Sequence, residues 1–226
     1  MEFWYNIAKG IVRTYLTFFV VGFDVQGKEN IEPGPKIIVA NHPNATDAFF
    51  LPFIFPEKLH FLIEEKTLNI TIIGRLLKLA DQIPVVAGRG REALGEACVK
   101  LAEGHSVAIF PEGHLSHGKA LRRAGAGAAL LALKSGAPLV PVGFYVPSEF
   151  TRRIRLSNND REIDGRWQMR GRCFIQIGEP WNLDLASYRD QSYCSLRELT
   201  DGIMLKIQNL VQLAENTVQA STALKL

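Results

Sequence analysis

The sequence of 226 residues is poor in cysteine. Its three cysteines are an odd number, lie far apart and form no C-x-x-C pair (Cys98, Cys173 and Cys194). These features exclude a disulfide scaffold and a cysteine zinc site, and they fit a reducing compartment.

The sequence also lacks an excess of charge of one sign. Lysine and arginine number 26 against 23 aspartates and glutamates, a formal net charge of +3, and no tail of like charges occurs. We therefore expect no nucleic-acid partner. Apolar residues make up 47% and charged residues 22% of the chain, which excludes a disordered protein. A chain of this length suits one domain.

No uninterrupted apolar run is long enough to span a membrane. A spanning helix needs about 20 mostly apolar residues, whereas Lys9 and Arg13 interrupt the apolar segment 2–23. The residues at its end, 20–24, form a poor cleavage site for a signal peptide. This segment is therefore expected to be neither a spanning helix nor a leader.

The same segment has the pattern of an amphipathic helix. Spacings of three and four place its polar side chains on one stripe, at Glu2, Asn6, Lys9, Arg13 and Thr17. The other side carries apolar residues, namely Phe3, Trp4, Ile7, Val12, Tyr15, Leu16 and Phe19. We predict that residues 1–24 form a helix on the membrane surface, at the cytoplasmic face of the cell membrane. The alternative is a helix that packs on the core of its own domain.

The remainder of the chain, residues 25–226, alternates between strand-like and helical patterns. Strands are predicted at 36–40, 59–64, 83–86, 107–110, 139–145 and 174–177. Helices are predicted at 44–55, 67–79, 91–103, 126–134 and 196–215. This alternation predicts a single α/β domain, with a central mostly parallel or mixed sheet flanked by helices.

An arginine-rich excursion at 151–172 interrupts this alternation. It holds seven arginines, and its local net charge is +4 (Arg152, Arg153, Arg155, Arg161, Arg166, Arg170 and Arg172, against Asp160, Glu162 and Asp164). Such a segment is able to meet anionic headgroups, a nucleotide diphosphate or an acidic carrier protein. The alternative is a solvated hairpin whose arginines pair with nearby acids.

Two stretches imitate nucleotide-binding motifs weakly. Residues 88–93 (GRGREA) follow a strand and open a helix, although not in the first unit of the sheet. Residues 113–119 (GHLSHGK) match a phosphate loop, but Ala120 replaces the hydroxyl residue that holds magnesium. No G-x-S-x-G occurs, which removes the ordinary serine-hydrolase elbow.

A histidine and an aspartate five residues apart follow the first predicted strand. In residues 39–47 (VANHPNATD), His42 lies at the end of the strand and Asp47 in the first turn of the next helix. Asp47 is able to hold one imidazole nitrogen, which leaves the other nitrogen as a general base. Alternatively, Asn44 and Asp47 form a helix cap and His42 is a turn residue.

A second candidate, residues 110–113 (FPEG), also follows a strand. The carboxyl ends of neighbouring strands form the ligand crevice of an open α/β sheet. Glu112 is placed to orient a hydroxylated substrate there, and Gly113 lets a substrate approach the backbone. The alternative is a simple turn, since Pro-x-Gly is common in turns.

Taken together, these stretches resemble the lysophospholipid and glycerol-phosphate O-acyltransferase family, its 1-acylglycerol-3-phosphate branch in particular. The resemblance runs in order over residues 25 to 210. Its segments are 25–31 (VQGKENI), 38–43 (IVANHP) with His-x4-Asp, 83–85 (IPV), 110–113 (FPEG), 136–142 (GAPLVPV), 177–180 (IGEP) and 196–201 (LRELTD).

The resemblance implies transfer of a fatty acyl group from a thioester, on coenzyme A or acyl carrier protein, to the hydroxyl of a lysolipid at a membrane surface. The expected acceptor is lysophosphatidic acid, which becomes phosphatidic acid. His42 would deprotonate the hydroxyl and Asp47 would hold the imidazole, with no acyl-enzyme, no metal and no bound cofactor. The residues expected to bind substrate are Asn41, Arg89, Glu112, Gly113, Ser116, Arg123 and Pro141.

Three departures from the family concern the residues that bind the acceptor phosphate. Leu115 stands where the family carries an arginine, Ala87 where it carries a basic residue, and Gly125 where a lysine is usual. A buried phosphate needs fixed cations. A non-phosphate lipid or alcohol acceptor therefore remains an alternative.

Two interpretations come from other functional classes. Glu112, His114 and His117 are candidates for the metal site of a hydrolase. A non-catalytic lipid-binding relative is the other alternative, although the presence of both His42 and Asp47 argues against it.

Overall fold

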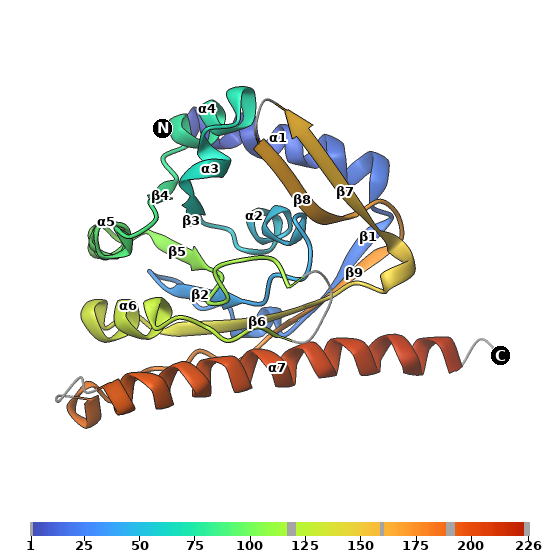
Figure 1. Ribbon diagram of the computed structural model, residues 1–226. Helices are drawn as coiled ribbons and strands as arrows, with labels where there is room; N and C mark the ends of the chain where they lie inside the picture. Colours follow the sequence, from blue (N-terminus) through green and yellow to red (C-terminus); the bar gives the residue numbers. More distant parts are fainter. Residues whose placement is uncertain (1, 117–120, 159–160, 189–192, 224–226) are drawn as a thin grey trace.

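The central element of the protein is a seven-stranded sheet. A computed structural model describes residues 2–116, 121–158, 161–188 and 193–223 (Figure 1). The strand order is β1-β9-β6-β2-β5-β3-β4. The strands are β1 (Gly22–Gln26), β2 (Ile37–Ala40), β3 (Leu59–Glu64), β4 (Ile83–Val85), β5 (Ser106–Ile109), β6 (Leu139–Tyr145) and β9 (Arg172–Ile177). Neighbours pair in parallel except β6 and β9, which are antiparallel. The predicted mixed α/β sheet is confirmed.

Helices cover both faces of this sheet (Figure 1). The α-helices are α1 (Glu2–Phe19), α2 (Leu51–Ile54), α3 (Glu65–Leu68), α4 (Thr71–Leu79), α5 (Gly90–Ala102), α6 (Gly127–Ser135) and α7 (Tyr193–Ala223). Short 3₁₀ helices are η1 (Lys28–Asn30), η2 (Asp47–Phe49), η3 (Ser148–Phe150) and η4 (Leu185–Tyr188). One face packs against α1 and α2, and the other against α5, α6 and α7.

Strand β2 lies in the middle of the sheet and shows why two apolar layers form. Its four residues are all buried. Successive side chains of a strand point to opposite faces, so Ile38 and Ala40 join the α1–α2 layer, whereas Ile37 and Val39 join the α5–α7 layer. A short continuous apolar run is the sequence pattern of such a doubly covered strand.

The predicted helix at 44–55 is wrong in length. The structure has η2 and the one-turn helix α2 there, because Pro52 has no N–H to continue an α-helical ladder. Phe50 N donates to Asp47 O instead, at 3.2 Å. The predicted helix at 67–79 is likewise two helices, α3 and α4, since Asn69 N donates to Glu65 O and closes α3.

Helix α1 has three sides instead of the predicted two. One side packs on the domain, where Tyr5 and Leu16 are buried and Val12 and Tyr15 are partly buried. A second side is polar and exposed. The third side, which we call the outer stripe, is apolar yet exposed and consists of Phe3, Trp4, Ile11 and Phe18. The packing of α1 on its own core and the exposure of an apolar surface are therefore both present.

The arginine-rich excursion is an antiparallel hairpin of β7 (Thr151–Asn158) and β8 (Arg161–Gln168), separate from the main sheet. Residues directly opposite each other in a pair share a face. Arg153 lies opposite Arg166 on one face, and Ile154 opposite Gly165 on the other. The predicted hairpin geometry is present, and contact with anionic groups stays a prediction.

Helix α7 is longer than the predicted 196–215 and crosses β6 at very short range. A Cβ on Gly143 of β6 would lie 2.6 Å from both Leu210 C and Val211 N of the α7 backbone. Any side chain at position 143 must therefore displace the helix.

Gly143→Ala is expected to lower the free energy of unfolding by about 1–3 kcal/mol, because overpacking forces the backbone apart. Urea unfolding followed by circular dichroism measures this change. The control is Gly95→Ala, which adds a methyl where nothing lies within 4 Å of the new Cβ. The control should raise stability by up to about 1 kcal/mol, since alanine favours helix. Equal effects of the two substitutions would contradict this packing.

Candidate active site

The carboxyl end of β2 places an imidazole beside a buried carboxylate. His42 follows the strand by two residues, and its Nδ1 lies 3.4 Å from Oδ2 of Asp47 in η2. The His42 side chain is 19% exposed and that of Asp47 is 0% exposed. Asp47 occupies Nδ1, which leaves Nε2 as the nitrogen that is able to accept a proton.

Asp47 also contacts the turn that precedes η2. Its Oδ2 accepts the backbone N–H of Asn44 at 2.6 Å, and its Oδ1 lies 3.4 Å from Asn44 Nδ2. One carboxylate therefore contacts both His42 and Asn44, whereas the predicted helix cap is absent, since η2 begins after Thr46 without a side-chain cap. Burial raises the pKa of Asp47, an effect opposed by His42 and Asn44.

The imidazole is also held across its flat face. The His42 ring stacks on Phe110, with centroids 4.0 Å apart and planes at 14°. Contact on an edge from Asp47 and on a face from Phe110 fixes the plane of the ring. A general base needs such fixed orientation, because the direction of its lone pair is set by the ring plane.

Glu112 joins two loops of the site through backbone hydrogen bonds. Its Oε1 accepts the N–H of His42 at 2.9 Å, and its Oε2 accepts the N–H of Arg122 at 2.8 Å. The side chain is 6% exposed. Both carboxylate oxygens thus hold the framework around His42, and contact of Glu112 and Gly113 with an acceptor stays a prediction.

Two further predicted residues adjoin the imidazole loop. The Asn41 amide donates to Phe144 O at 2.9 Å and accepts Phe144 N–H at 2.7 Å, so it ties β2 to β6. Ser116 N donates to His42 O at 3.0 Å. The Ser116 hydroxyl is buried and has no hydrogen-bond partner in the described parts of the chain.

Other predicted residues lie apart or outside the described structure. Arg89 is exposed at the start of α5, after β4, and pairs with Glu92 at 2.8 Å. Pro141 is buried in mid-strand opposite Val39, and Arg123 is exposed. His117, Gly118 and Lys119 lie outside the described residues, so the histidine pair and the phosphate-loop match are not placed. Within the described ranges, no group of three histidine, cysteine or acidic residues is placed to hold a metal ion.

Sequence reasoning missed the hairpin as part of this site. Ala45 N donates to Arg166 O at 2.8 Å, which joins β8 to the loop between His42 and Asp47. A Cβ on Gly165 would lie 3.1 Å from Leu115 Cδ1. The alternation of charged and apolar residues in Arg153, Ile154 and Arg155 is the signal that predicts a strand here.

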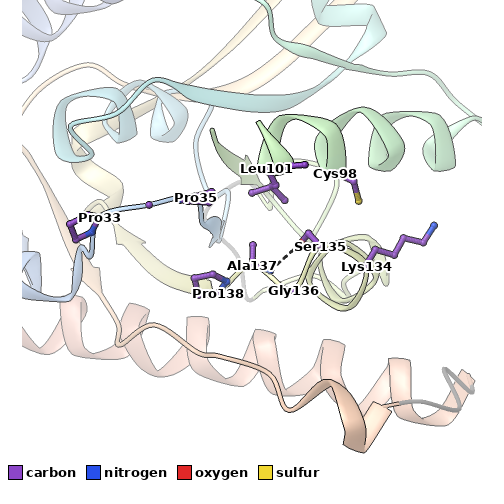
Figure 2. A pocket seen from close by; sticks show the side chains of 11 residues that line it. Pro33, Pro35, Cys98, Leu101, Lys134, Ser135, Gly136, Ala137 and Pro138 are labelled. Carbon is purple, nitrogen blue, oxygen red and sulfur yellow. Dashed lines mark hydrogen bonds between the residues drawn. The ribbon is translucent and has the colours of Figure 1, made fainter. Parts of the chain in front are cut away.

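A surface hollow of about 640 Å³ lies at the opposite, amino-terminal ends of the strands (Figure 2). Pro35 and Pro138, which precede β2 and β6, line it together with Cys98, Leu101 and Lys134. Ligands of open α/β sheets bind at the carboxyl ends of strands. We therefore place the candidate site at His42 and not in this hollow.

Comparison with known proteins gives a family match over residues 22–145, which fit the Acyltransferase family model. That range contains His42, Asp47 and Glu112. A 1-acyl-sn-glycerol-3-phosphate acyltransferase of Pseudomonas aeruginosa is 30% identical over 136 residues, 57% of this chain and 52% of that protein. The enzyme of the same name in Borreliella burgdorferi is 30% identical over 133 residues, 56% and 52% of the two chains.

A human relative and a solved structure extend the comparison. The human 1-acyl-sn-glycerol-3-phosphate acyltransferase beta is 28% identical over 152 residues, 64% of this chain and 54% of that protein. The crystal structure of the 1-acyl-sn-glycerophosphate (LPA) acyltransferase from Thermotoga maritima has a TM-score of 0.62 at 23% identity, over 94% and 78% of the chains. It shows the same fold. This chain spans about half the length of the curated relatives it matches.

Asp47→Asn is expected to raise the melting temperature at pH 7. The folded pKa of Asp47 lies above the value of about 3.9 in an unfolded chain. The stability that the protonated carboxyl supplies is therefore complete below pH ~3.9 and is lost as pH rises through the folded pKa. Asparagine does not ionise, so its advantage should be largest at pH 7 and shrink towards pH 4. Calorimetric melts across this range measure it.

The control for this prediction is Asp184→Asn. Hydrogen bonds from Ser187 and Ala186 lower the pKa of the exposed Asp184, so its substitution should leave the melting temperature unchanged or lower it at pH 7. A lower melting temperature of Asp47→Asn at pH 7 would contradict the cost assigned to burying this carboxylate.

Proposed function

Because this chain belongs to the acyltransferase family, we propose that it transfers a fatty acyl group from a thioester to the hydroxyl of a lysolipid. The observation that carries the proposal is the contact of His42 with Asp47 at the carboxyl end of a central strand, inside the residues that match the family. The relatives named for 1-acyl-sn-glycerol-3-phosphate support lysophosphatidic acid as the acceptor and phosphatidic acid as the product.

In the proposed reaction, Nε2 of His42 accepts the proton of the acceptor hydroxyl while Asp47 holds the proton on Nδ1. The acceptor oxygen attacks the thioester carbonyl and forms the ester bond. The carbon–sulfur bond then breaks, and the leaving thiolate takes the proton from the imidazolium. General-base help of this kind contributes about 10²–10⁴-fold to a rate. The chemistry uses no resident cofactor or metal, and coenzyme A or acyl carrier protein presents the thioester.

The tetrahedral intermediate needs a hydrogen-bond donor for its oxyanion. Several backbone N–H groups around His42 already have acceptors: Asn44 donates to Asp47, Ala45 to Arg166, Gly113 to Phe110 and Ser116 to His42. The Ser116 hydroxyl is buried beside this loop and has no partner within the described ranges. We assign the Ser116 hydroxyl as the side-chain donor to substrate.

One observation favours the alternative acceptor without a phosphate. Leu115, at the position of the family's arginine, packs against the hairpin beside Gly165. The neighbouring Arg122 has its Nη1 3.4 Å from Leu115 O and is exposed. A neutral lipid or a long-chain alcohol needs no cation at this position, so the acceptor panel below includes both.

The outer stripe of α1 supports a membrane-surface location. Phe3, Ile11 and Phe18 are more than half exposed, and Phe18 is 78% exposed. No helix within the described residues has the length and apolar character to cross a bilayer. We propose that α1 lies in the membrane surface with the outer stripe towards the lipid, on the cytoplasmic face.

His42→Ala is expected to lower acyl transfer at least 10²-fold, because the general base is removed. The measurement is thiol release from palmitoyl-coenzyme A with lysophosphatidic acid, lysophosphatidylcholine, monoacylglycerol or a long-chain alcohol. His105→Ala, an exposed histidine at the amino end of β5, is the control and should keep wild-type rates. Turnover by His42→Ala at the wild-type rate would sink the proposed mechanism and favour a binding role.

Replacing Trp4, Ile11 and Phe18 together by serine is expected to weaken binding to phosphatidylglycerol-containing vesicles at least tenfold. Each apolar side chain contributes about 1.5–3 kcal/mol when it leaves water. Vesicle sedimentation measures the bound fraction. The control replaces Asn6 and Thr17, on the polar side of α1, by serine and should bind as the wild type does. Full binding by the triple variant would contradict the proposed orientation.

A further inference from the structure

Tyr15 links α1 to the hairpin above the candidate site. Its hydroxyl donates to Gln168 O at the end of β8. Its ring contacts Phe49, with centroids 5.7 Å apart, and Trp167, with centroids 6.2 Å apart. Burial raises the pKa of Tyr15 to about 12, so the hydroxyl keeps its proton and remains a donor throughout the working pH range.

The end of β8 that Tyr15 holds is itself firmly placed. Gln168 is 0% exposed, and its Nε2 donates to Arg170 O at 3.2 Å and to Gly171 O at 3.3 Å. Val21, just beyond α1, donates its N–H to Gly171 O at 2.9 Å. The last turns of α1 and the exit of the hairpin are thus joined at two points.

From this end, the hairpin reaches both loops of the site. Gln168 N lies 3.5 Å from the Thr46 hydroxyl, and Ala45 N donates to Arg166 O at 2.8 Å. Thr46 directly precedes Asp47. On the other side, Gly165 lies against Leu115, whose neighbour Ser116 donates its N–H to His42 O. Tyr15 is therefore connected with the loop that carries His42 and Asp47 by two successive contacts: Tyr15 bonds to the hairpin, and the hairpin bonds to the loop.

We propose that Tyr15 is a positioning residue for acyl transfer: through Gln168, it holds the hairpin over the His42–Asp47 loop and so fixes the geometry of the dyad. This inference rests on the proposed function and adds to it a second role for α1. The helix that is proposed to meet the membrane is also a support of the active site.

The test is Tyr15→Phe, which removes the hydroxyl and keeps the ring contacts with Phe49 and Trp167. The matched control is Tyr5→Phe on the same helix, which removes a hydroxyl that accepts Leu59 N–H at 3.3 Å, far from the hairpin. Tyr15→Phe is expected to lower kcat about tenfold to 100-fold, the range for misplaced reacting groups, with little change in KM. Tyr5→Phe should keep kcat.

Two further measurements distinguish a role of Tyr15 in positioning the His42–Asp47 loop from a role in membrane binding by α1. Vesicle binding should be the same in both variants, because the outer stripe is intact. Deuterium uptake at 42–47, followed by mass spectrometry, should be faster in Tyr15→Phe and unchanged in Tyr5→Phe, since the Ala45 N–H bond depends on the hairpin. Gly165→Val places a side chain between the hairpin and the loops that carry Leu115 and Ala45, and it should also lower kcat and speed the uptake at 42–47.

Wild-type kcat, or wild-type uptake at 42–47, in Tyr15→Phe would overturn the proposal. A loss of kcat that coincides with lost vesicle binding and unchanged uptake would overturn it as well, because Tyr15 would then act only in anchoring. If the wild type transfers no acyl group to any acceptor, the proposed function fails. The uptake comparison still decides in that case whether Tyr15 holds the loop.

Discussion

The carboxylate of Asp47 is fully buried, and the architecture of the site is arranged around that constraint. A buried charge is costly unless it is paired and hydrogen-bonded. Asn44 supplies a backbone N–H at 2.6 Å, and His42 supplies the neighbouring imidazole. Because η2 lies within the segment that joins β2 to α2, the hydrogen bonds of this carboxylate also fix the path of the loop. The imidazole is then held where β2 ends.

A second buried carboxylate ties this loop to the rest of the carboxyl edge. Glu112 accepts the N–H of His42 and the N–H of Arg122, so the loops after β2 and β5 cannot move independently. Asn41 does the same between β2 and β6 by pairing with both polar groups of Phe144. Buried N–H groups need acceptors, and here side chains supply them where strand pairing ends. Asn41 and Glu112, which the sequence suggests as substrate-binding residues, thus hold the backbone around His42 in the structure.

Much of the fold could be predicted from local pattern. The run 37–40 is apolar throughout, which is typical of a strand covered on both faces, and the His-x4-Asp spacing placed His42 and Asp47 correctly beside each other. The helix at 44–55 was predicted wrongly, because its apolar spacing is helical while Pro52 removes a donor in its middle. The spacing of apolar side chains indicates which face of a segment is buried, but it does not show whether each residue is able to make the backbone hydrogen bonds of a helix.

The parts that could not be predicted depend on contacts between distant segments. The spacing of α1 shows polar and apolar sides, but only tertiary packing divides the apolar side into a buried part at Leu16 and an exposed part at Ile11. In the same way, nothing local to 151–172 indicates that Arg166 O accepts a bond from Ala45. The hairpin enters the site by backbone contacts, which leave no residue-type signal in the sequence.

The buried side and the outer stripe of α1 connect the active site at the carboxyl end of β2 with the surface of the protein. Tyr15 faces the hairpin and Phe18, less than one helical turn later, faces outward. A helix turn is stiff, so these two side chains move together. With the outer stripe seated on lipid as proposed, the membrane then restrains the same turn that restrains Gln168. Gln168 belongs to the hairpin, and the hairpin in turn bonds to Ala45 in the loop between His42 and Asp47. In this proposed arrangement, binding to the lipid surface would restrain the active-site loop through one turn of α1.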